Sequence, residues 1–481
     1  MDSEFPAQSD AADEDPFPAS KVQEQLFLAQ QTVGDAPTFH IPCFWEVRGT
    51  VDIPALRNAF DAVLTRHEAL RTTFRIHERG LLQVVHPEPR WEWRLATCRD
   101  AEEREQRMAR HARAPFDLEN GPLIRAGLLH CADGSHVVMF CAHHAVFDGW
   151  SAKLVLDELA AHYRAFTTGT EPGLPGVNYQ YGDYSLWHDE WLASPAGERA
   201  RHEWAELLAG DLPVLELPGD LPLPDPDSTA APGGTADVPL PAAAVEQLAA
   251  LATGLRTTPF TVLLAAYDLL LADRTGLRDL VVGTPAANRG RTEFQSTVGC
   301  FVNMVAVRTD LSGPRTFREL VERVRAAVLR AQDLQAVPFE TVVKEVRPPR
   351  HRGHPPVFQV AFTVGEDFFQ PVRAGELEFR PVEVPSVTAK YQLSLQVNRT
   401  ADGPVAEFEY RADRFTPEWI ADFAASYARV LELAAERPDR PLTDFLGSAS
   451  PPRAPRPPDP SSWSTPRTGR GCPPTPSPPT R

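Results

Sequence analysis

Lysine is scarce in this chain of 481 residues. It occurs only at positions 21, 153, 344 and 390, so 44 of the 48 basic residues are arginine. Acidic residues number 65, which gives a net charge of −17. A free-standing nucleic-acid binder needs a basic surface, so DNA and RNA are poor candidate partners for this protein.

Long apolar runs are also lacking. No stretch of about 18 apolar residues occurs, so no membrane span and no membrane partner are expected. The N-terminus begins with the acidic stretch Met1 to Phe5 and has no basic-then-apolar run, so a secretory signal is not expected. The sequence therefore predicts a globular protein of the cytoplasm.

The cysteines show no chemistry of their own. None are spaced as CxxC, and no Cys/His cluster has zinc spacing, so neither a metal site nor a cysteine nucleophile is expected. Without a signal peptide, buried reduced thiols are the expected state. The six are Cys43, Cys98, Cys131, Cys141, Cys300 and Cys472.

Helix and strand patterns alternate through both halves, which favours an α/β or α+β fold. Loop-rich breaks fall at 168–176 and 211–241. Residues 1–18 are polar and acidic, and residues 449–481 hold 12 prolines, so both ends are expected to be disordered. Apolar spacing predicts helices at 51–70, 152–166, 242–254, 259–273, 316–333 and 416–436, and strands at 136–142, 280–283, 357–364 and 389–398.

A histidine pair, His143-His144, stands between a predicted strand and a predicted helix, followed by Asp148 and Gly149. Adjacent residues on an extended backbone point to opposite faces, so the two imidazoles do not easily share one metal ion. One could pack inward while the other faces a cavity as a neutral proton acceptor. Asp148 would hold the loop, often through an arginine, and Gly149 would permit a tight turn. A buried histidine pair at a strand end, without catalysis, fits these residues equally well.

Further motifs along the chain change this balance. His143, His144, Asp148 and Gly149 match the pattern HHxxxDG. Together with this pattern, the further motifs resemble the motifs of the condensation domains of nonribosomal peptide synthetases, within the chloramphenicol-acetyltransferase-like superfamily. The resemblance covers nearly the whole predicted ordered chain. The matching segments are Arg66-His67-Glu68-Ala69-Leu70-Arg71-Thr72-Thr73-Phe74, Tyr181-Gly182-Asp183-Tyr184-Ser185-Leu186-Trp187, Gly283-Thr284-Pro285-Ala286-Ala287-Asn288-Arg289, Val298-Gly299-Cys300-Phe301-Val302-Asn303, and Gln332-Asp333 with Val337-Pro338-Phe339-Glu340.

The resemblance implies two acetyltransferase-like lobes, 19–175 and 176–448, in a V-shaped pseudo-dimer with a central tunnel. Donor and acceptor carrier proteins would insert phosphopantetheine arms from opposite faces, and no cofactor or metal would be bound. An acyl or aminoacyl thioester would pass to an amine, giving an amide, or to a hydroxyl, giving an ester. The acceptor would be on a second carrier or be a free small molecule, and no acyl-enzyme would form.

The resemblance also assigns roles. His144 would be the catalytic histidine, His143 mainly structural, and Asp148 would pair with Arg289, supported by Gly149. The residues expected in the tunnel or in substrate positioning are Trp150, Ser151, Asn303 and Gln392.

Two departures from the family pattern are present. In the opening motif Val22, Gln25 and Phe27 replace the usual alanine, arginine and tryptophan, and the missing arginine bears on packing of the first lobe. The segment Lys390-Tyr391-Gln392-Leu393 resembles the family's KFDL, but Gln392 replaces the aspartate, which bears on the polarity of the acceptor side. Basic residues at Arg347, Arg350 and Arg352 are a candidate carrier contact.

Two alternative functions stay open at this point. One is a catalytically silent recruitment module, although such modules usually lose part of the histidine motif that this chain keeps. The other is an epimerisation domain, whose motif typically continues as DGVSWR, whereas here Gly149 is followed by Trp150-Ser151-Ala152. No nucleotide-binding loop or carrier segment is recognised, so a free-standing condensation enzyme is expected.

Overall fold

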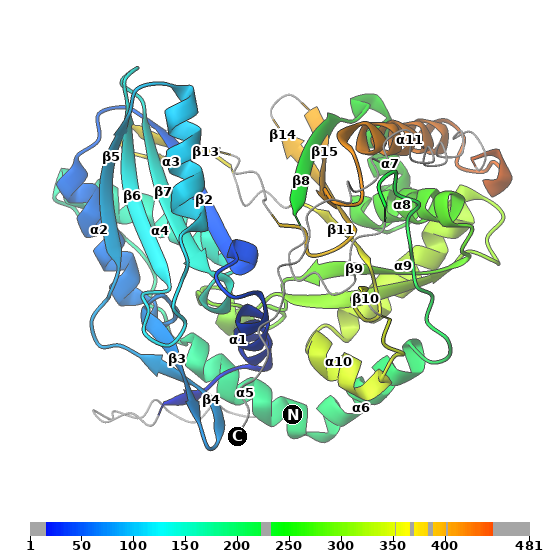
Figure 1. Cartoon of the computed structure of the whole chain (residues 1–481), viewed down its shortest axis with the longest axis horizontal. Coiled ribbons are helices and arrows are strands. Elements are labelled where there is room, and N and C mark those ends of the chain that lie inside the picture. Colours follow the sequence, from blue (N-terminus) through cyan, green and yellow to red (C-terminus); the bar gives the residue numbers. More distant parts are fainter. Residues whose placement is uncertain are drawn as a thin grey trace, which may run out of the picture.

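The computed structural model describes residues 16–222, 232–351, 353–365, 370–382, 388–400 and 403–445. Two lobes stand side by side, each built on a six-stranded sheet, and they approach one another at the end where α1 and α5 lie (Figure 1). The mixed α/β fold predicted from the sequence is confirmed. Residues 1–15 and the predicted disordered tail, 449–481, lie outside the described residues.

The sheet of the first lobe has the strand order β12-β13-β2-β7-β6-β5. Its central strand β7 is antiparallel to both neighbours, and β5 runs parallel to β6 at the edge. Nearly all of β7 is buried, so the histidine pair at its end is carried by a rigid central strand. The strands are β2 (His40–Arg48), β5 (Glu92–Cys98), β6 (Ile124–Cys131), β7 (His136–His143), β12 (Val372–Ala374) and β13 (Leu377–Val382).

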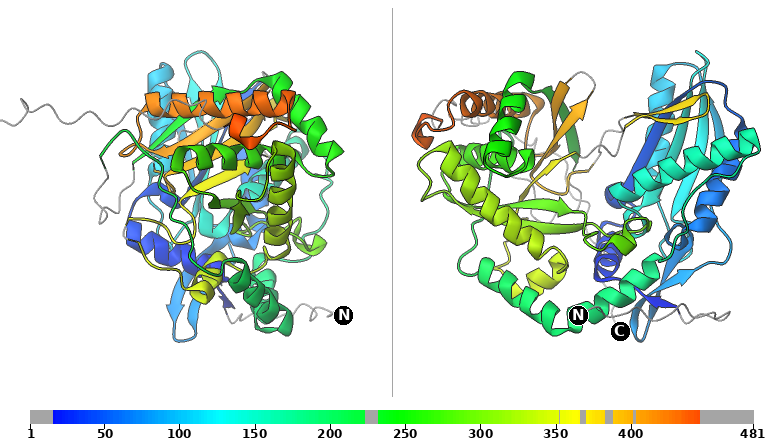
Figure 2. Two further views of the ribbon diagram at one scale, coloured as in Figure 1. Left: turned by 90° about the vertical axis from the view of Figure 1, so that its right-hand side faces the viewer. Right: turned by 180° about the vertical axis from the view of Figure 1, so that it is seen from behind.

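Helices α2 (Ile53–Arg66) and α4 (Gly149–Thr168) pack against each other on the first lobe, and α3 (Ala101–Arg113) packs on β2, β5 and β7. Seen from behind, α4 runs along the sheet (Figure 2). The end of α4 explains the predicted break at 168–176, because Gly169 adopts the left-handed conformation that terminates helices, with φ of 71°.

The sheet of the second lobe has the order β10-β9-β11-β14-β15-β8. Helices α7 (Ala242–Gly254), α8 (Pro259–Thr275), α9 (Phe317–Asp333) and α11 (Pro417–Glu436) pack with it. Residues 261–272 of α8 are buried on every side, as expected of a helix that is apolar all round. The strands are β8 (Gly233–Pro239), β9 (Asp279–Ala286), β10 (Asn303–Asp310), β11 (Val360–Val364), β14 (Leu393–Thr400) and β15 (Gly403–Arg411).

Smaller elements lie at the end where the lobes approach. A three-stranded sheet, β1 (Phe17–Pro18), β4 (Gly80–Val85) and β3 (Thr72–His77), lies beside α5. Helix α5 continues directly into α6, which packs on α10 in the second lobe. The helices are α1 (Lys21–Val33), α5 (Tyr181–Ala193), α6 (Pro195–Leu207) and α10 (Phe339–Val346).

Three details differ from the sequence prediction. Phe17 and Pro18, predicted to be disordered, form β1 because they pair with Leu82 and Gln83 of β4. The predicted loop 211–241 contains β8, which pairs with β15. The hairpin β12–β13, predicted within the second lobe at 176–448, belongs to the first sheet because β13 pairs with β2. The two lobes are therefore not two continuous stretches of chain.

Each lobe has its own hydrophobic core, and the first core also contains residues from the second half of the sequence. Phe294, Val298, Cys300 and Phe301 are buried there, among residues of β7 and α4. In the described part of the chain no single helix is long and apolar enough to cross a bilayer, and α7 with α8 reaches that length only across a bend of 113°. The segment 294–301 thus fastens one lobe to the other beside the histidine pair.

Candidate active site between the lobes

The chain changes from strand to helix at the histidine pair. Strand β7 ends at His143, a single 3-10 turn covers His144–Val146, and α4 starts at Gly149. Asp148 caps α4, since its carboxylate accepts a hydrogen bond from Ser151 N at 2.8 Å. Gly149 has open space around the position of a Cβ and no positive φ. The predicted need for glycine at a tight turn is therefore not seen.

His143 is fully buried and held from both ring nitrogens. Its Nε2 lies 3.1 Å from Gln30 Oε1, and its Nδ1 accepts a hydrogen bond from Ala145 N at 3.1 Å. Burial, together with the neighbouring positive groups, lowers the pKa of His143 to about 3. A neutral imidazole with both nitrogens engaged can shape the turn but has no free nitrogen for substrate, which fits the structural role expected for it.

His144 points the other way and lines a cavity between the lobes. Its Nδ1–H donates to the carbonyl of Phe147 at 2.8 Å, which leaves Nε2 as the acceptor nitrogen. In the described part of the chain Nε2 has no hydrogen-bond partner. Burial and the positive charge of Lys390 lower the pKa of His144 to about 4. At neutral pH the imidazole is uncharged and can accept a proton.

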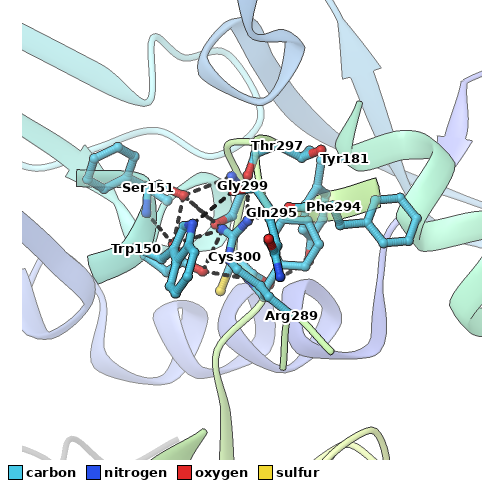
Figure 3. Close-up of polar contacts among 12 residues, drawn as sticks. Trp150, Ser151, Tyr181, Arg289, Phe294, Gln295, Thr297, Gly299 and Cys300 are labelled. Carbon is cyan, nitrogen blue, oxygen red and sulfur yellow. Dashed lines mark hydrogen bonds and ion pairs between the residues drawn. The ribbon is translucent and has the colours of Figure 1, made fainter. Parts of the chain in front are cut away.

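The predicted pair of Asp148 and Arg289 is present, with Nη2 of Arg289 at 3.2 Å from both carboxylate oxygens. The carboxylate also accepts hydrogen bonds from Ser151 Oγ at 2.7 Å and from Phe301 N at 3.0 Å. Arg289 donates through Nη1 to the carbonyls of Phe294 and Thr297. Both charged groups are almost fully buried. Figure 3 shows this network from Ser151 to Arg289.

This network joins the two lobes at the start of α4, just after the 3-10 turn that carries His144. Asp148 and Ser151 belong to the first lobe, whereas Arg289 and Phe301 come from the second half of the sequence. Ser151 Oγ also accepts a hydrogen bond from Gly299 N at 3.0 Å. Because a buried ion pair is costly to break on one side only, the network fixes the position of the 3-10 turn that carries His144.

The cavity has a volume of about 530 Å³ and is walled by both lobes. Cys300 lies at its edge, with Sγ 3.6 Å from His144 Nδ1, and burial raises the pKa of its thiol well above the usual value. That thiol therefore stays protonated and is no nucleophile. The polar and charged residues that line the cavity without having been predicted to do so are Gln25, Glu340, Thr363, Lys390, Tyr391, Ser394, Gln396, Glu407 and Glu409.

Only one of the four residues expected in the tunnel lines this cavity. Asn303 does so, but its amide is fully engaged: Nδ2 donates to the carbonyls of Gln335 and Val337, and Oδ1 accepts from Phe339 N. Asn303 therefore positions the start of α10 instead of offering a free amide to substrate.

The other three do not line the cavity, contrary to the prediction. Ser151 is buried in the ion-pair network, and the indole of Trp150 donates to the carbonyl of Gln295 at 2.9 Å. Gln392 holds the backbone of residues 215–217, accepting from Leu217 N and donating to Leu215 O. The departure at position 392 therefore concerns this backbone contact, whereas Gln25, the other departure, lies in the cavity wall.

A second cavity, of about 660 Å³, adjoins the first and shares Glu340, Pro355 and Pro356 with it. Arg347 and Arg350, from the predicted basic patch, line it together with Lys344, whereas Arg352 lies outside the described residues. The five described cysteines are free and buried, as predicted, and Cys472 lies outside the described residues. Among the described residues no group of three metal-ligating side chains is placed to hold an ion.

The sequence matches known proteins over almost all of its described length. The family model named Condensation domain matches residues 13–448. A linear gramicidin synthase of Brevibacillus parabrevis is 35% identical over 437 residues, which is 89% of this chain and 6% of that protein. Chondramide synthase cmdD of Chondromyces crocatus is 34% identical over 437 residues, 90% of this chain and 11% of that protein. The chain thus spans about a tenth or less of these two relatives.

Solved structures give the same picture. The X-domain from teicoplanin biosynthesis is 27% identical with a TM-score of 0.79, covering 91% of this chain and 99% of that one, and it has also been solved in complex with OxyB. SgcC5 from Streptomyces globisporus, solved with (R)-(-)-1-(2-naphthyl)-1,2-ethanediol and sucrose, is 26% identical with a TM-score of 0.71. The match covers 88% of this chain and all of SgcC5.

Proposed function

Because this chain belongs to the condensation-domain family of nonribosomal peptide synthesis, we propose that it is an active acyltransferase. It transfers an acyl or aminoacyl group from a carrier-protein thioester to an amine or a hydroxyl. Condensation domains act on substrates that carrier proteins present on phosphopantetheine arms, so the partners of this chain are a donor carrier and either an acceptor carrier or a free acceptor molecule.

One observation supports catalysis most strongly, namely the state of His144. The side chain lines a cavity between two lobes, its Nδ1–H is fixed on the carbonyl of Phe147, and its Nε2 carries a free lone pair. Its lowered pKa keeps the imidazole neutral at pH 7. A general base needs this combination of access, fixed tautomer and neutrality.

The reaction follows from that geometry. As the neutral amine or hydroxyl attacks the thioester carbonyl, a C–N or C–O bond forms, and Nε2 of His144 accepts the proton that the nucleophile loses. The tetrahedral intermediate then collapses, the C–S bond breaks, and the carrier thiolate takes up a proton. No covalent bond to the enzyme is made, which agrees with the protonated, buried thiol of Cys300 beside the histidine.

The test is an acyl-transfer assay with acyl groups loaded on a carrier or on a pantetheine mimic. Amines and alcohols are offered as acceptors, because SgcC5 was solved with a 1,2-diol, and products are measured by mass. His144→Ala should lose about 100-fold or more of the wild-type rate. The control is His202→Ala, since His202 lies exposed on α6. Equal rates in wild type and a folded His144→Ala protein would refute the assigned role.

The second candidate is a recruitment module without catalysis. It is favoured by the likeness to the teicoplanin X-domain, which has been solved in complex with OxyB. The same assay separates the two functions: a wild-type protein that binds carrier but gives no product with any acceptor supports recruitment. Product formation that depends on His144 supports the acyltransferase.

A further inference from the structure

Lys390 opens the segment that resembles the family's KFDL, and the sequence alone predicts no role for it. It precedes β14 in the second lobe and lines the cavity that His144 lines from the first lobe. Of the four lysines in the chain, all within the described residues, it alone lines this cavity. Its Nζ lies 5.3 Å from the ring centre of Phe39, a residue of the first lobe. The side chain therefore reaches across the gap toward the histidine wall.

The ammonium group of Lys390 has no anionic partner in the described part of the chain. No carboxylate oxygen there lies within 4.0 Å of Nζ, although Glu340, Glu407 and Glu409 line the same cavity. Glu407 accepts a hydrogen bond from Asn398 Nδ2 at 3.0 Å instead. Lys390 is exposed to the cavity, so water can solvate its ammonium, and its N–H donors are open to an anionic ligand that enters the cavity.

The surroundings of Lys390 set its charge. Partial desolvation by the cavity walls lowers the pKa of its ammonium, while the negative charge of Glu409 raises it. Glu409 therefore helps to keep Lys390 protonated without occupying its hydrogen-bonding positions. Lys390 in turn lowers the pKa of His144. The cation of Lys390 and the neutral imidazole of His144 thus share one cavity. A substrate oxygen bound by Lys390 would place the reacting carbon near His144.

We propose that Lys390 binds an anionic oxygen of the substrate in this cavity, an inference that rests on the proposed acyl transfer. Two sources share this chemistry. One is a carboxylate of a free acceptor such as an amino acid, bound in the ground state. The other is the thioester carbonyl oxygen, which gains a full negative charge when the nucleophile attacks and the π electrons move onto it. When the carrier thiolate leaves, the electrons return to the carbonyl, and Lys390 keeps its proton.

Kinetics with Lys390→Gln and Lys390→Arg distinguish the two sources. Acceptors are offered in pairs, an amino acid and its methyl ester, which differ only in the carboxylate. If Lys390 binds a carboxylate, Lys390→Gln raises KM about 10-fold or more for the acid and leaves the ester unchanged. If it stabilises the oxyanion, kcat falls by about that factor for both acceptors. In either case Lys390→Arg retains most of the activity. The matched control is Lys153→Gln, on the exposed face of α4.

A binding measurement keeps this inference separate from the proposed function. The probe is a phosphonate whose tetrahedral anionic phosphorus replaces the reacting carbonyl on a pantetheine arm, titrated calorimetrically into wild type and Lys390→Gln. If Lys390→Gln binds the phosphonate about 10-fold more weakly than wild type, Lys390 forms part of an anion site, whether or not wild type transfers an acyl group. A wild type that transfers no acyl group would contradict the proposed function and not the role of Lys390. Equal phosphonate affinity, together with kcat and KM within twofold of wild type for every acceptor, would overturn the role of Lys390.

Discussion

Replacing Asp148 by alanine should destabilise the protein strongly, because it leaves the buried guanidinium of Arg289 without its carboxylate. The pair is almost inaccessible to solvent, with both Nη2–O distances at 3.2 Å. Removing one partner of such a pair costs about 3–5 kcal/mol. Arg289 keeps the carbonyls of Phe294 and Thr297 as acceptors. We therefore expect a loss of unfolding free energy at the lower end of this range, about 3 kcal/mol.

A double-mutant cycle tests this estimate. Arg289→Ala should cost a similar free energy of unfolding, because it leaves the carboxylate of Asp148 buried with only neutral donors. The double variant Asp148→Ala/Arg289→Ala should lose clearly less free energy of unfolding than the two single variants lose together. The coupling energy between the two side chains should be at least about 1.5 kcal/mol. The measurement is urea-induced unfolding of all four proteins, followed by fluorescence. Additive single-variant effects would show that the two side chains do not act as a pair and would refute the reasoning.

Two further predictions concern titrating groups. With an alcohol acceptor, which does not titrate in this range, acyl transfer should stay constant from pH 8 to about pH 5, because the pKa of His144 is about 4; a fall in rate centred near pH 6.5 would contradict a neutral, buried imidazole. Asp268 is fully buried in α8, and burial raises its pKa to about 7 against a smaller lowering effect of the Thr309 hydroxyl. Its folded-state preference for the protonated form means that stability declines as pH rises from about 4 to 7, and Asp268→Asn should remove that decline. At pH 8 the Asp268→Asn variant should gain at most about 4 kcal/mol in free energy of unfolding relative to wild type. Thermal unfolding of wild type and Asp268→Asn at pH 5 and pH 8 measures this, and the same pH dependence in both proteins would contradict the reasoning.

The sequence predicts the local part of the site well. The pairing of Asp148 with Arg289, which are 141 positions apart, follows from the family motifs, and the structure contains it. Strand alternation also predicts opposite orientations for His143 and His144, and the structure has them, although His144 lies in the 3-10 turn that follows β7. The ion pair could be predicted because both partners lie in recognisable motifs, not because they are neighbours in the sequence.

Other parts depend on how distant segments meet. Trp150 and Ser151 follow the motif directly, but α4 begins at Gly149 and turns each successive side chain by about 100°, so neither faces the cavity. On β15 the half-buried Glu407 and Glu409 alternate with buried residues. This alternation predicts one polar face, whereas only the position of the first lobe makes that face a cavity wall. The pairing of β13 with β2 is likewise a long-range contact that local pattern does not encode.

The central claim is that Nε2 of His144 accepts the proton of the nucleophile. Its most direct test is a single-turnover measurement of thiol release from an acyl-loaded carrier, with saturating acceptor, in wild type and His144→Ala. The account predicts that the variant binds the loaded carrier as wild type does but releases thiol more slowly, by about 100-fold or more. Thiol release at the wild-type rate from a folded His144→Ala protein would contradict it.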